Sequence, residues 1–172
     1  IGIARSLVLN PRLLICDEPV SALDVSIQAQ VVNLLKDLQK KLGLALIFFA
    51  HDLSVVRHII DLVMVIYMGQ AVEVAEKESL YRKPLHPYTN ALIKSVPVPD
   101  SKLAATARRE NWLTGDMPSP YDRPKGCAFH TRCPFRGKRC EADVPPLRKM
   151  DIGDWVACHR AEDLDLSIEE DA

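Results

Sequence analysis

The sequence predicts an α/β fold, with a mostly parallel sheet covered by helices on both faces and an irregular extension after it, from two observations. Over residues 1–75, apolar runs of strand length alternate with amphipathic runs of helix length. Helices commonly cross over between parallel strands and cover the faces of the sheet, so this alternation favours a parallel arrangement. From residue 76 onward, short helical patterns, prolines and cysteines replace it. We therefore expect one domain over 1–75 and an irregular extension with an acidic tail over 76–172.

Each element of the first domain has its own signal. A helix that is already under way at Ile1 stops at Asn10-Pro11, and the apolar run Leu13–Asp17 is typical of a buried strand. Apolar positions at helical spacing predict a helix over Ser26–Leu42, ended by Gly43. A second buried strand is expected over Leu44–Ala50.

The remaining elements follow in order. Asp52 can cap a short helix that runs through Ile60, and two further strands, Leu62–Tyr67 and Ala71–Ala75, flank a tight turn at Gly69. The extension then starts with two helices. They are predicted over Glu76–Arg82 and from Pro87 to about Val96.

The rest of the extension has little helix or strand signal. Residues 101–126 are polar and rich in proline, so we expect a linker or extended wrap there, with Trp112-Leu113 as an anchor. The acidic segment from Glu162 to Ala172 has no aromatic residue, and we expect it to be solvated.

Composition narrows the class of protein. The 172 residues are 48% hydrophobic, enough for a core, and the net charge of −1 gives no general attraction to nucleic acid. No apolar run approaches the ~18 residues that a membrane-spanning helix needs, and no basic-then-apolar leader is present. We expect a cytoplasmic protein.

Two adjacent carboxylates, Asp17 and Glu18, follow directly on the first buried strand. At the mouth of a strand, one carboxylate can hold a metal ion while the other acts on a water molecule, as nucleotide hydrolysis requires. The alternative is a helix cap with a solvated first turn, but Pro19 and the run Ser-Ala-Leu-Asp that ends at Asp24 argue against it. The chain has no G-x-x-x-x-G-K-[ST] loop to cradle phosphates.

Three motifs resemble, in order, the Walker B strand, the D-loop and the switch histidine of ABC-transporter ATPases. They are Leu13–Pro19, Ser21-Ala22-Leu23-Asp24 and Ala50-His51-Asp52. The resemblance implies a partial RecA-like P-loop NTPase sheet that lacks the Walker A strand. The chain would then be the C-terminal half of an ATPase subunit, and this half would be inactive by itself.

The resemblance also implies a role for each site residue. Asp17 would hold the Mg²⁺ of ATP through water, and Glu18 would act as the general base or orient the attacking water. His51 would sense the transferring phosphate. Asp24 would lie at the interface of two ATPase subunits that sandwich two ATP molecules.

The predicted sheet is incomplete. In the ABC fold, the strand with the phosphate loop lies between the strands expected here over Leu44–Ala50 and Leu62–Tyr67. Its absence would leave unpaired edges and bare apolar faces, so we expect the chain to dimerise, swap elements or rearrange.

The extension contains four cysteines in the pattern C-x5-C-x6-C-x17-C: Cys127, Cys133, Cys140 and Cys158. A reducing cytoplasm disfavours disulfides, and a structural zinc site usually includes a C-x2-4-C knuckle, which is absent. Iron-sulfur and zinc are therefore nearly level by spacing, with disulfides third. Cys16 is interpreted as a small buried hydrophobe.

A second resemblance covers the extension. The element Pro84–Leu92 and the run Gly126–Pro134 are similar to the C-terminal extension of oligopeptide and dipeptide importer ATPases. Members of that group with four such cysteines are thought to bind a [4Fe-4S] cluster, which makes this the preferred cofactor beside ATP and Mg²⁺. Zn²⁺, with His130 or His159 as a ligand, is the alternative.

The combined resemblance implies an ATPase that drives peptide import at the cytoplasmic face of the bacterial inner membrane. Its partners would be two transmembrane permease subunits and a second ATPase subunit, identical or paralogous. A periplasmic or lipid-anchored peptide-binding protein would contribute indirectly.

The alternatives are a redox-sensing iron-sulfur module on an ATPase scaffold, an ABC ATPase for nickel or another solute, and a soluble ABC protein acting on DNA or ribosomes. Basic residues surround Phe135, as in nucleic-acid-binding knuckles, but such runs are mostly solvated faces, and we expect no nucleic acid partner.

Overall fold

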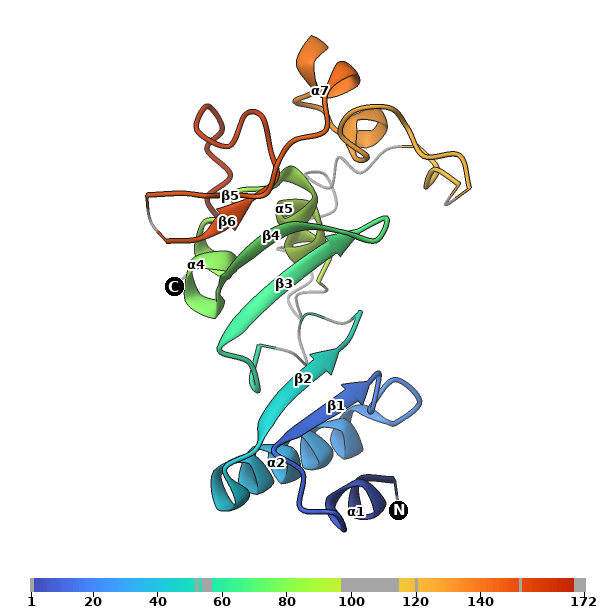
Figure 1. Ribbon diagram of the computed structural model, residues 1–172, viewed down its shortest axis with the longest axis vertical. Helices are drawn as coiled ribbons and strands as arrows, with labels where there is room; N and C mark the ends of the chain where they lie inside the picture. The colour runs from blue at the N-terminus through green and yellow to red at the C-terminus, as the bar shows by residue number, and fades with distance from the viewer. Residues whose placement is uncertain are drawn as a thin grey trace, which may run out of the picture. The chain divides into compact units, whose positions relative to one another are not determined.

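The computed structural model describes residues 2–51, 53, 57–96, 115–119, 121–151 and 153–168. The chain divides into two compact units, Ile1–Ile60 and Asp61–Ala172, and each is described by itself. Figure 1 shows the elements of both units. The predicted domain boundary after Ala75 stays a prediction.

The first unit contains helix α1 (Gly2–Leu7), strand β1 (Leu13–Asp17), helix α2 (Val25–Leu42) and strand β2 (Ala45–Phe49). The two strands pair in parallel and in register, from Leu13 opposite Ala45 to Asp17 opposite Phe49. Helix α2 is the crossover between them, as parallel pairing requires. The predicted α/β character and these four elements are confirmed.

The core of the first unit lies between the sheet and α2. Leu14 and Cys16 of β1 are buried in one cluster with Val32 and Leu35 of α2. Cys16 is therefore the buried hydrophobe that the sequence predicted. The alternate residues of both strands leave the opposite face exposed: Leu13, Ile15, Ile47 and Phe49.

The second unit is built on an antiparallel sheet in the order β3-β4-β6-β5. Its strands are β3 (Leu62–Tyr67), β4 (Gln70–Glu76), β5 (Arg148–Lys149) and β6 (Trp155–Val156). The expectation of a mostly parallel sheet is wrong for this unit. Only Met68 and Gly69 connect β3 to β4, with φ values of 50° and 76°, and a two-residue connection closes an antiparallel hairpin.

Two helices follow the hairpin, close to where the sequence predicted them. Helix α4 spans Lys77–Arg82 and helix α5 spans Pro87–Lys94, with Pro87 in the first turn. Further along the chain are a 3-10 turn, η1 (His130–Arg132), and a short helix, α7 (Lys138–Ala142). Two-residue strands and single turns like these carry no periodic sequence signal, so they were not predicted.

The acidic tail is not a solvated end over its described part. The side chain of Leu166 is buried, and its carbonyl accepts a 2.7 Å hydrogen bond from Asn90 Nδ2 of α5. The backbone N–H of Ile168 donates to the carbonyl of Arg82, 2.9 Å away. Apolar residues between the acidic positions explain this docking, and the expectation of a solvated tail is corrected for residues 162–168.

Several predictions fall wholly or partly outside the described residues. They concern Asp52, most of the helix expected after it, the segment 97–114 and the Trp112-Leu113 anchor. None of the helices within the described ranges has the length and apolar character of a bilayer-spanning segment.

Candidate functional site

The acidic pair lies at the carboxyl end of β1. Asp17 is the last residue of the strand, and Glu18 extends the parallel ladder by one hydrogen bond, from its N–H to the carbonyl of Phe49 at 3.1 Å. Both acidic residues are exposed. Ligand sites of open α/β sheets lie beyond the carboxyl ends of their strands, which is where this pair stands.

The backbone of Glu18 is in the left-handed region, with φ of 43°. A residue with a Cβ adopts this region rarely, and a non-glycine residue held there stores on the order of 1 kcal/mol. Such strain is commonly found at functional sites.

His51 meets Glu18 across the ends of the two strands. Its Nδ1 lies 3.3 Å from Glu18 Oε1, where Nδ1–H can donate to the carboxylate. The side chains are 70% and 51% exposed, so water screens any charge between them and a substrate could reach both. The structure therefore brings together these two predicted residues, 33 positions apart, beside Asp17.

The segment from Glu18 to Asp24 consists of consecutive turns. Ser21 donates to the carbonyl of Glu18 through its backbone N–H at 3.3 Å and through its Oγ at 3.1 Å. The N–H of Leu23 donates to the carbonyl of Val20 at 3.1 Å. Asp24 is the N-cap of α2 but makes no side-chain capping hydrogen bond, and its side chain is exposed.

The four cysteines of the extension line one cavity. Cys127, Cys133, Cys140 and Cys158 share its wall with His86, Phe129, His130 and His159. All five cysteines of the chain are described, and none forms a disulfide. The backbone joins two of the four, because the N–H of Cys127 donates to the carbonyl of Cys140 at 2.8 Å.

Three thiols of this cavity, those of Cys127, Cys133 and Cys158, have raised pKa values. Burial raises the pKa of Cys133 to about 12 and that of Cys158 to about 11, and the neighbouring cysteines add to both shifts. Burial also raises the pKa of the Cys127 thiol. A metal centre would reverse this preference, since thiolates are the form that ligates metals.

The donor set of four soft thiols on one wall fits a thiolate-ligated group in its chemistry. The arrangement of the side chains, however, does not form such a site. Within the described residues, no group of three or more His, Cys, Asp or Glu side chains is arranged to hold a metal ion. The iron-sulfur cluster and its zinc alternative stay predictions.

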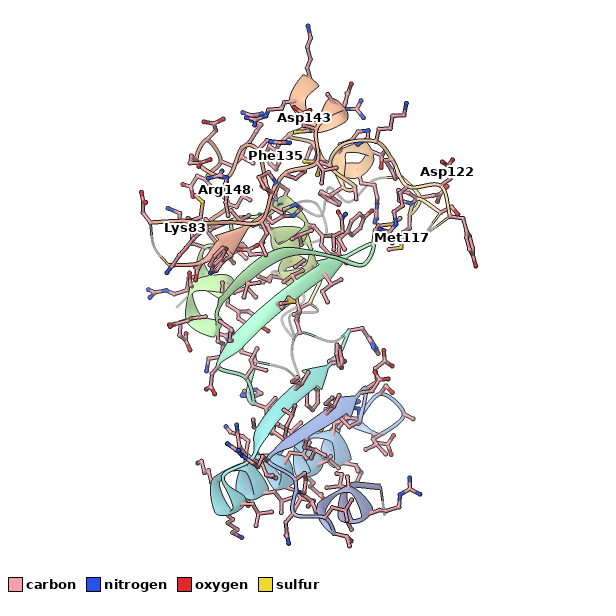
Figure 2. The ribbon with its side chains drawn as sticks, viewed as in Figure 1. Lys83, Met117, Asp122, Phe135, Asp143 and Arg148 are labelled. Atoms are coloured by element: carbon pink, nitrogen blue, oxygen red, sulfur yellow. The ribbon has the colours of Figure 1, made fainter. Side chains whose placement is uncertain are left out.

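Loops of the extension are tied together around the cysteines. Both terminal nitrogens of Arg148 donate to the carboxylate of Glu162, and Nη2 also donates to the carbonyl of Cys158 at 3.2 Å. Arg160 Nη1 donates to the carbonyl of Phe135 at 3.1 Å. Figure 2 labels Phe135 and Arg148 among the side chains of these loops. The guanidinium groups of Arg148 and Arg160 are therefore both hydrogen-bonded within the protein.

Sequence reasoning missed a buried polar pair, Glu73 and His86. Glu73 of β4 accepts backbone N–H bonds from Leu85 at 2.7 Å and from His86 at 3.0 Å, and burial raises its pKa to about 7. His86 Nδ1 accepts the N–H of Tyr88 at 3.0 Å, and burial lowers its pKa to about 3. A lone Glu in an apolar strand pattern was the available signal.

Comparison with known proteins identifies relatives over most of the chain. Residues 72–140 match the family model described as the oligopeptide/dipeptide transporter, C-terminal region. The chain is 57% identical over 159 residues to a probable peptide ABC transporter ATP-binding protein of Sinorhizobium fredii, covering 92% of this chain and 44% of the relative.

Two further relatives have similar identities. One is the putative oligopeptide transport ATP-binding protein YkfD of Bacillus subtilis, with 54% identity over 92% of this chain and 48% of the relative. The other is the oligopeptide transport ATP-binding protein OppF of Salmonella typhimurium, with 53% identity over 95% of this chain and 48% of the relative. The chain thus spans about half the length of the curated relatives that it matches.

Proposed function

Because this chain is related over more than nine-tenths of its length to the ATP-binding proteins of oligopeptide ABC transporters, we propose that it is part of an ATPase subunit that energises peptide import. The relatives are about twice as long, so the proposal concerns a whole subunit of which these residues form one half. β1 and β2 would belong to the RecA-like parallel sheet of that subunit.

The contact between Glu18 and His51 is the observation that carries this proposal. In hydrolysis, Asp17 would hold the hydrated Mg²⁺ of ATP, and Glu18 would orient or deprotonate the attacking water. His51, hydrogen-bonded to Glu18, would position this carboxylate and contact the γ-phosphate. The phosphates themselves would be held by a Gly-rich loop, which the sequence of these 172 residues does not contain.

The whole subunit would work at the cytoplasmic face of the bacterial inner membrane. Two permease subunits would span the bilayer, and a second ATPase subunit would close the nucleotide sandwich at Asp24. ATP binding would close the pair and hydrolysis would reopen it, driving alternating access of the permease. A peptide-binding protein on the other side of the membrane would deliver the peptide.

The test uses the full gene product with its permease partners in lipid vesicles, where ATP hydrolysis and peptide uptake are measured together. Glu18→Gln should lower kcat at least about 100-fold and leave ATP binding in place, since the carboxylate acts on water and not on the bound nucleotide. Asp37→Asn removes one charge at an exposed position of α2 and is the control. A Glu18→Gln protein that still hydrolyses ATP would refute the assignment.

We propose in addition that Cys127, Cys133, Cys140 and Cys158 hold a [4Fe-4S] cluster that ties the loops of the extension together. Their place on one cavity and their free state support this, as does the resemblance of the extension. When bound, the cluster would supply a cross-link between distant segments, without taking part in hydrolysis.

Iron content and visible absorption after anaerobic purification test the cluster. Wild-type protein should carry about four irons per chain with broad visible absorption, and Cys133→Ser should lose both. Cys16→Ala, which changes a cysteine buried in the other unit, should lose neither. Stoichiometric zinc without iron would replace the cluster by a zinc centre, and absence of metal would remove the cofactor proposal.

A further inference from the structure

Gln28, in the first turn of α2, contacts the loop that separates the acidic pair from Asp24. Its side-chain Nε2 lies 3.1 Å from the carbonyl oxygen of Val20 and 2.9 Å from that of Leu23. A glutamine amide nitrogen has two protons, so both can be donated, one to each carbonyl. One side chain thus bridges the two ends of a four-residue turn.

The two accepting carbonyls differ in how they are otherwise held. Val20 is buried in the core of the first unit, which anchors its end of the turn. Leu23 is partly exposed and lies beside Asp24, so its end has less packing to hold it. The Gln28 side chain therefore transmits the position of the anchored end, and of α2, to the exposed end.

Asp24 is at the N-cap of α2, where an aspartate usually accepts a hydrogen bond from the first turn of its helix. Here it makes no such bond. The ordinary means of fixing this helix start is therefore not used, and the carboxylate of Asp24 stays exposed to solvent. Instead, the side-chain amide of Gln28 holds the residues before the helix, because it donates to the carbonyls of Val20 and Leu23.

We propose that Gln28 is a positioning residue that fixes the loop Val20–Asp24 so that the carboxylate of Asp24 is presented outward instead of capping its own helix. The catalytic part of this inference rests on the proposed ATPase function, in which Asp24 faces the second subunit. The structural part is that Gln28 clamps the loop through the two hydrogen bonds from its Nε2 to the carbonyls of Val20 and Leu23. This part depends on those bonds alone.

The decisive variant is Gln28→Glu, which keeps the size of the side chain but replaces the donating nitrogen with an oxygen. Two carbonyl oxygens would then face an acceptor, so the turn should loosen. Gln30→Glu introduces the same charge at an exposed position two residues further along α2 and is the matched control. Gln28→Lys restores a donor with three protons and should rescue the clamp.

Hydrogen exchange of the full gene product reads the clamp directly. The amides of Ser21 and Leu23, which are hydrogen-bonded within the turn, should exchange about tenfold faster in Gln28→Glu and at the wild-type rate in Gln30→Glu. Unchanged exchange in Gln28→Glu would overturn the proposal, whatever the enzyme's activity.

ATPase kinetics measure how the position of this loop affects catalysis. Gln28→Glu should lower kcat about tenfold with an unchanged KM for ATP, because the loop does not hold the nucleotide, and Gln28→Lys should recover most of the loss. If the turn loosens in Gln28→Glu while kcat stays unchanged, Gln28 holds the loop but does not position it for catalysis. That result would overturn the positioning role. If the wild-type protein does not hydrolyse ATP, the proposed function fails, and the exchange result still decides the clamp.

Discussion

At the scale of single residues, the candidate site depends on how two exposed side chains are held next to one another. Glu18 and His51 are both more than half exposed, so their contact contributes little to the free energy of unfolding. Its value lies in orientation. The left-handed backbone of Glu18 and the parallel pairing of β1 with β2 bring the two groups to one place.

Removing the His51 side chain should therefore affect turnover more than stability. In the full gene product we expect His51→Ala to lower kcat for ATP at least about 100-fold, with the melting temperature nearly unchanged, because an exposed contact is lost from the site. Steady-state ATPase assays and thermal unfolding measure the two effects. His58→Ala, at another exposed histidine of the same unit, should change neither. Equal kcat values in the two variants would contradict the role of His51.

The buried carboxyl of Glu73 predicts a pH dependence of stability. Its pKa of about 7 in the native protein lies above the ordinary value of 4.5, mainly because of burial. Between these two pH values the native state binds more protons than the unfolded state, so the free energy of unfolding falls as pH rises. The favourable contribution is complete below pH 4.5 and is lost by about pH 7, a change on the order of 3 kcal/mol.

Urea denaturation at pH 5 and pH 8 checks this contribution. Glu73→Gln does not titrate, so its stability should fall less than that of the wild type between the two pH values. Glu76→Gln, at an exposed position of the same strand, should follow the wild type. His86, with its lowered pKa, gives a slope of opposite sign in all three proteins and cancels in the comparison. Parallel pH profiles for wild type and Glu73→Gln would contradict the prediction.

At the scale of elements, the turn before Cys127 has the tightest backbone approach described for any glycine of the chain. Gly126 has φ of 71°, and a Cβ added there would lie 2.5 Å from the carbonyl oxygen of Cys140. The backbone of Glu141 would lie 2.8 Å away. Only glycine fits between these segments, which hold Cys127 beside Cys140.

Gly126→Ala should therefore destabilise the second unit by more than backbone strain alone. Gly153 also has a positive φ, 98°, but a Cβ there would meet nothing within 4 Å. Both alanine variants lose about 1 kcal/mol through the positive φ, and Gly126→Ala should lose about 2 kcal/mol more through the clash. Chemical denaturation of the two variants measures the difference. Equal losses would indicate that the α7 segment moves aside without cost.

The elements differ in how well the sequence predicts them. Helix α2 and strands β1 and β3 were located within a few residues, because long periodic or apolar runs determine them. The sheet around β3 was not predicted. The tight turn expected at Gly69 fits the antiparallel pairing of β3 with β4, but the alternation of strands and helices was interpreted as one mostly parallel sheet. β5 and β6 have two residues each, too few for any pattern.

The candidate site shows the same limit. Motif order proposed Asp17, Glu18 and His51 as candidates, and their roles stay predictions. The two hydrogen bonds of Gln28 could not be proposed in this way, because they depend on how a side chain folds back onto its own loop. Likewise, the buried state of Glu73 follows from tertiary packing that local sequence does not encode. Positions of residues along the chain were predictable, whereas hydrogen-bond partners required the structure.

At the scale of the whole molecule, each unit leaves one apolar sheet surface exposed. In the first unit it consists of Leu13, Ile15, Ile47 and Phe49, and in the second of Leu62, Met64 and Ile66 on β3. The alternate residues of β1 and β3 are mostly buried, so these surfaces are genuine second faces of the sheets. Continuous apolar surface of this kind favours association.

The isolated chain of 172 residues should therefore self-associate, and charges on these faces should weaken the association. We expect Ile15→Lys and Met64→Lys each to raise the dissociation constant on the order of tenfold, because each removes an apolar contact from an interface. Sedimentation velocity over a concentration series measures it. Val25→Lys, at an exposed apolar residue off both faces, is the control. A chain that stays monomeric at all concentrations would contradict the prediction.

The chain divides into its two units after Ile60, and this division separates the acidic pair from the four-cysteine cavity. Every strand of the antiparallel sheet and every residue that lines the four-cysteine cavity comes after that point. The acidic pair, its histidine and its clamped loop all come before it. The candidate nucleotide site and the four-cysteine cavity therefore belong to separate units of the chain, so that either set of residues can be changed while the other is kept.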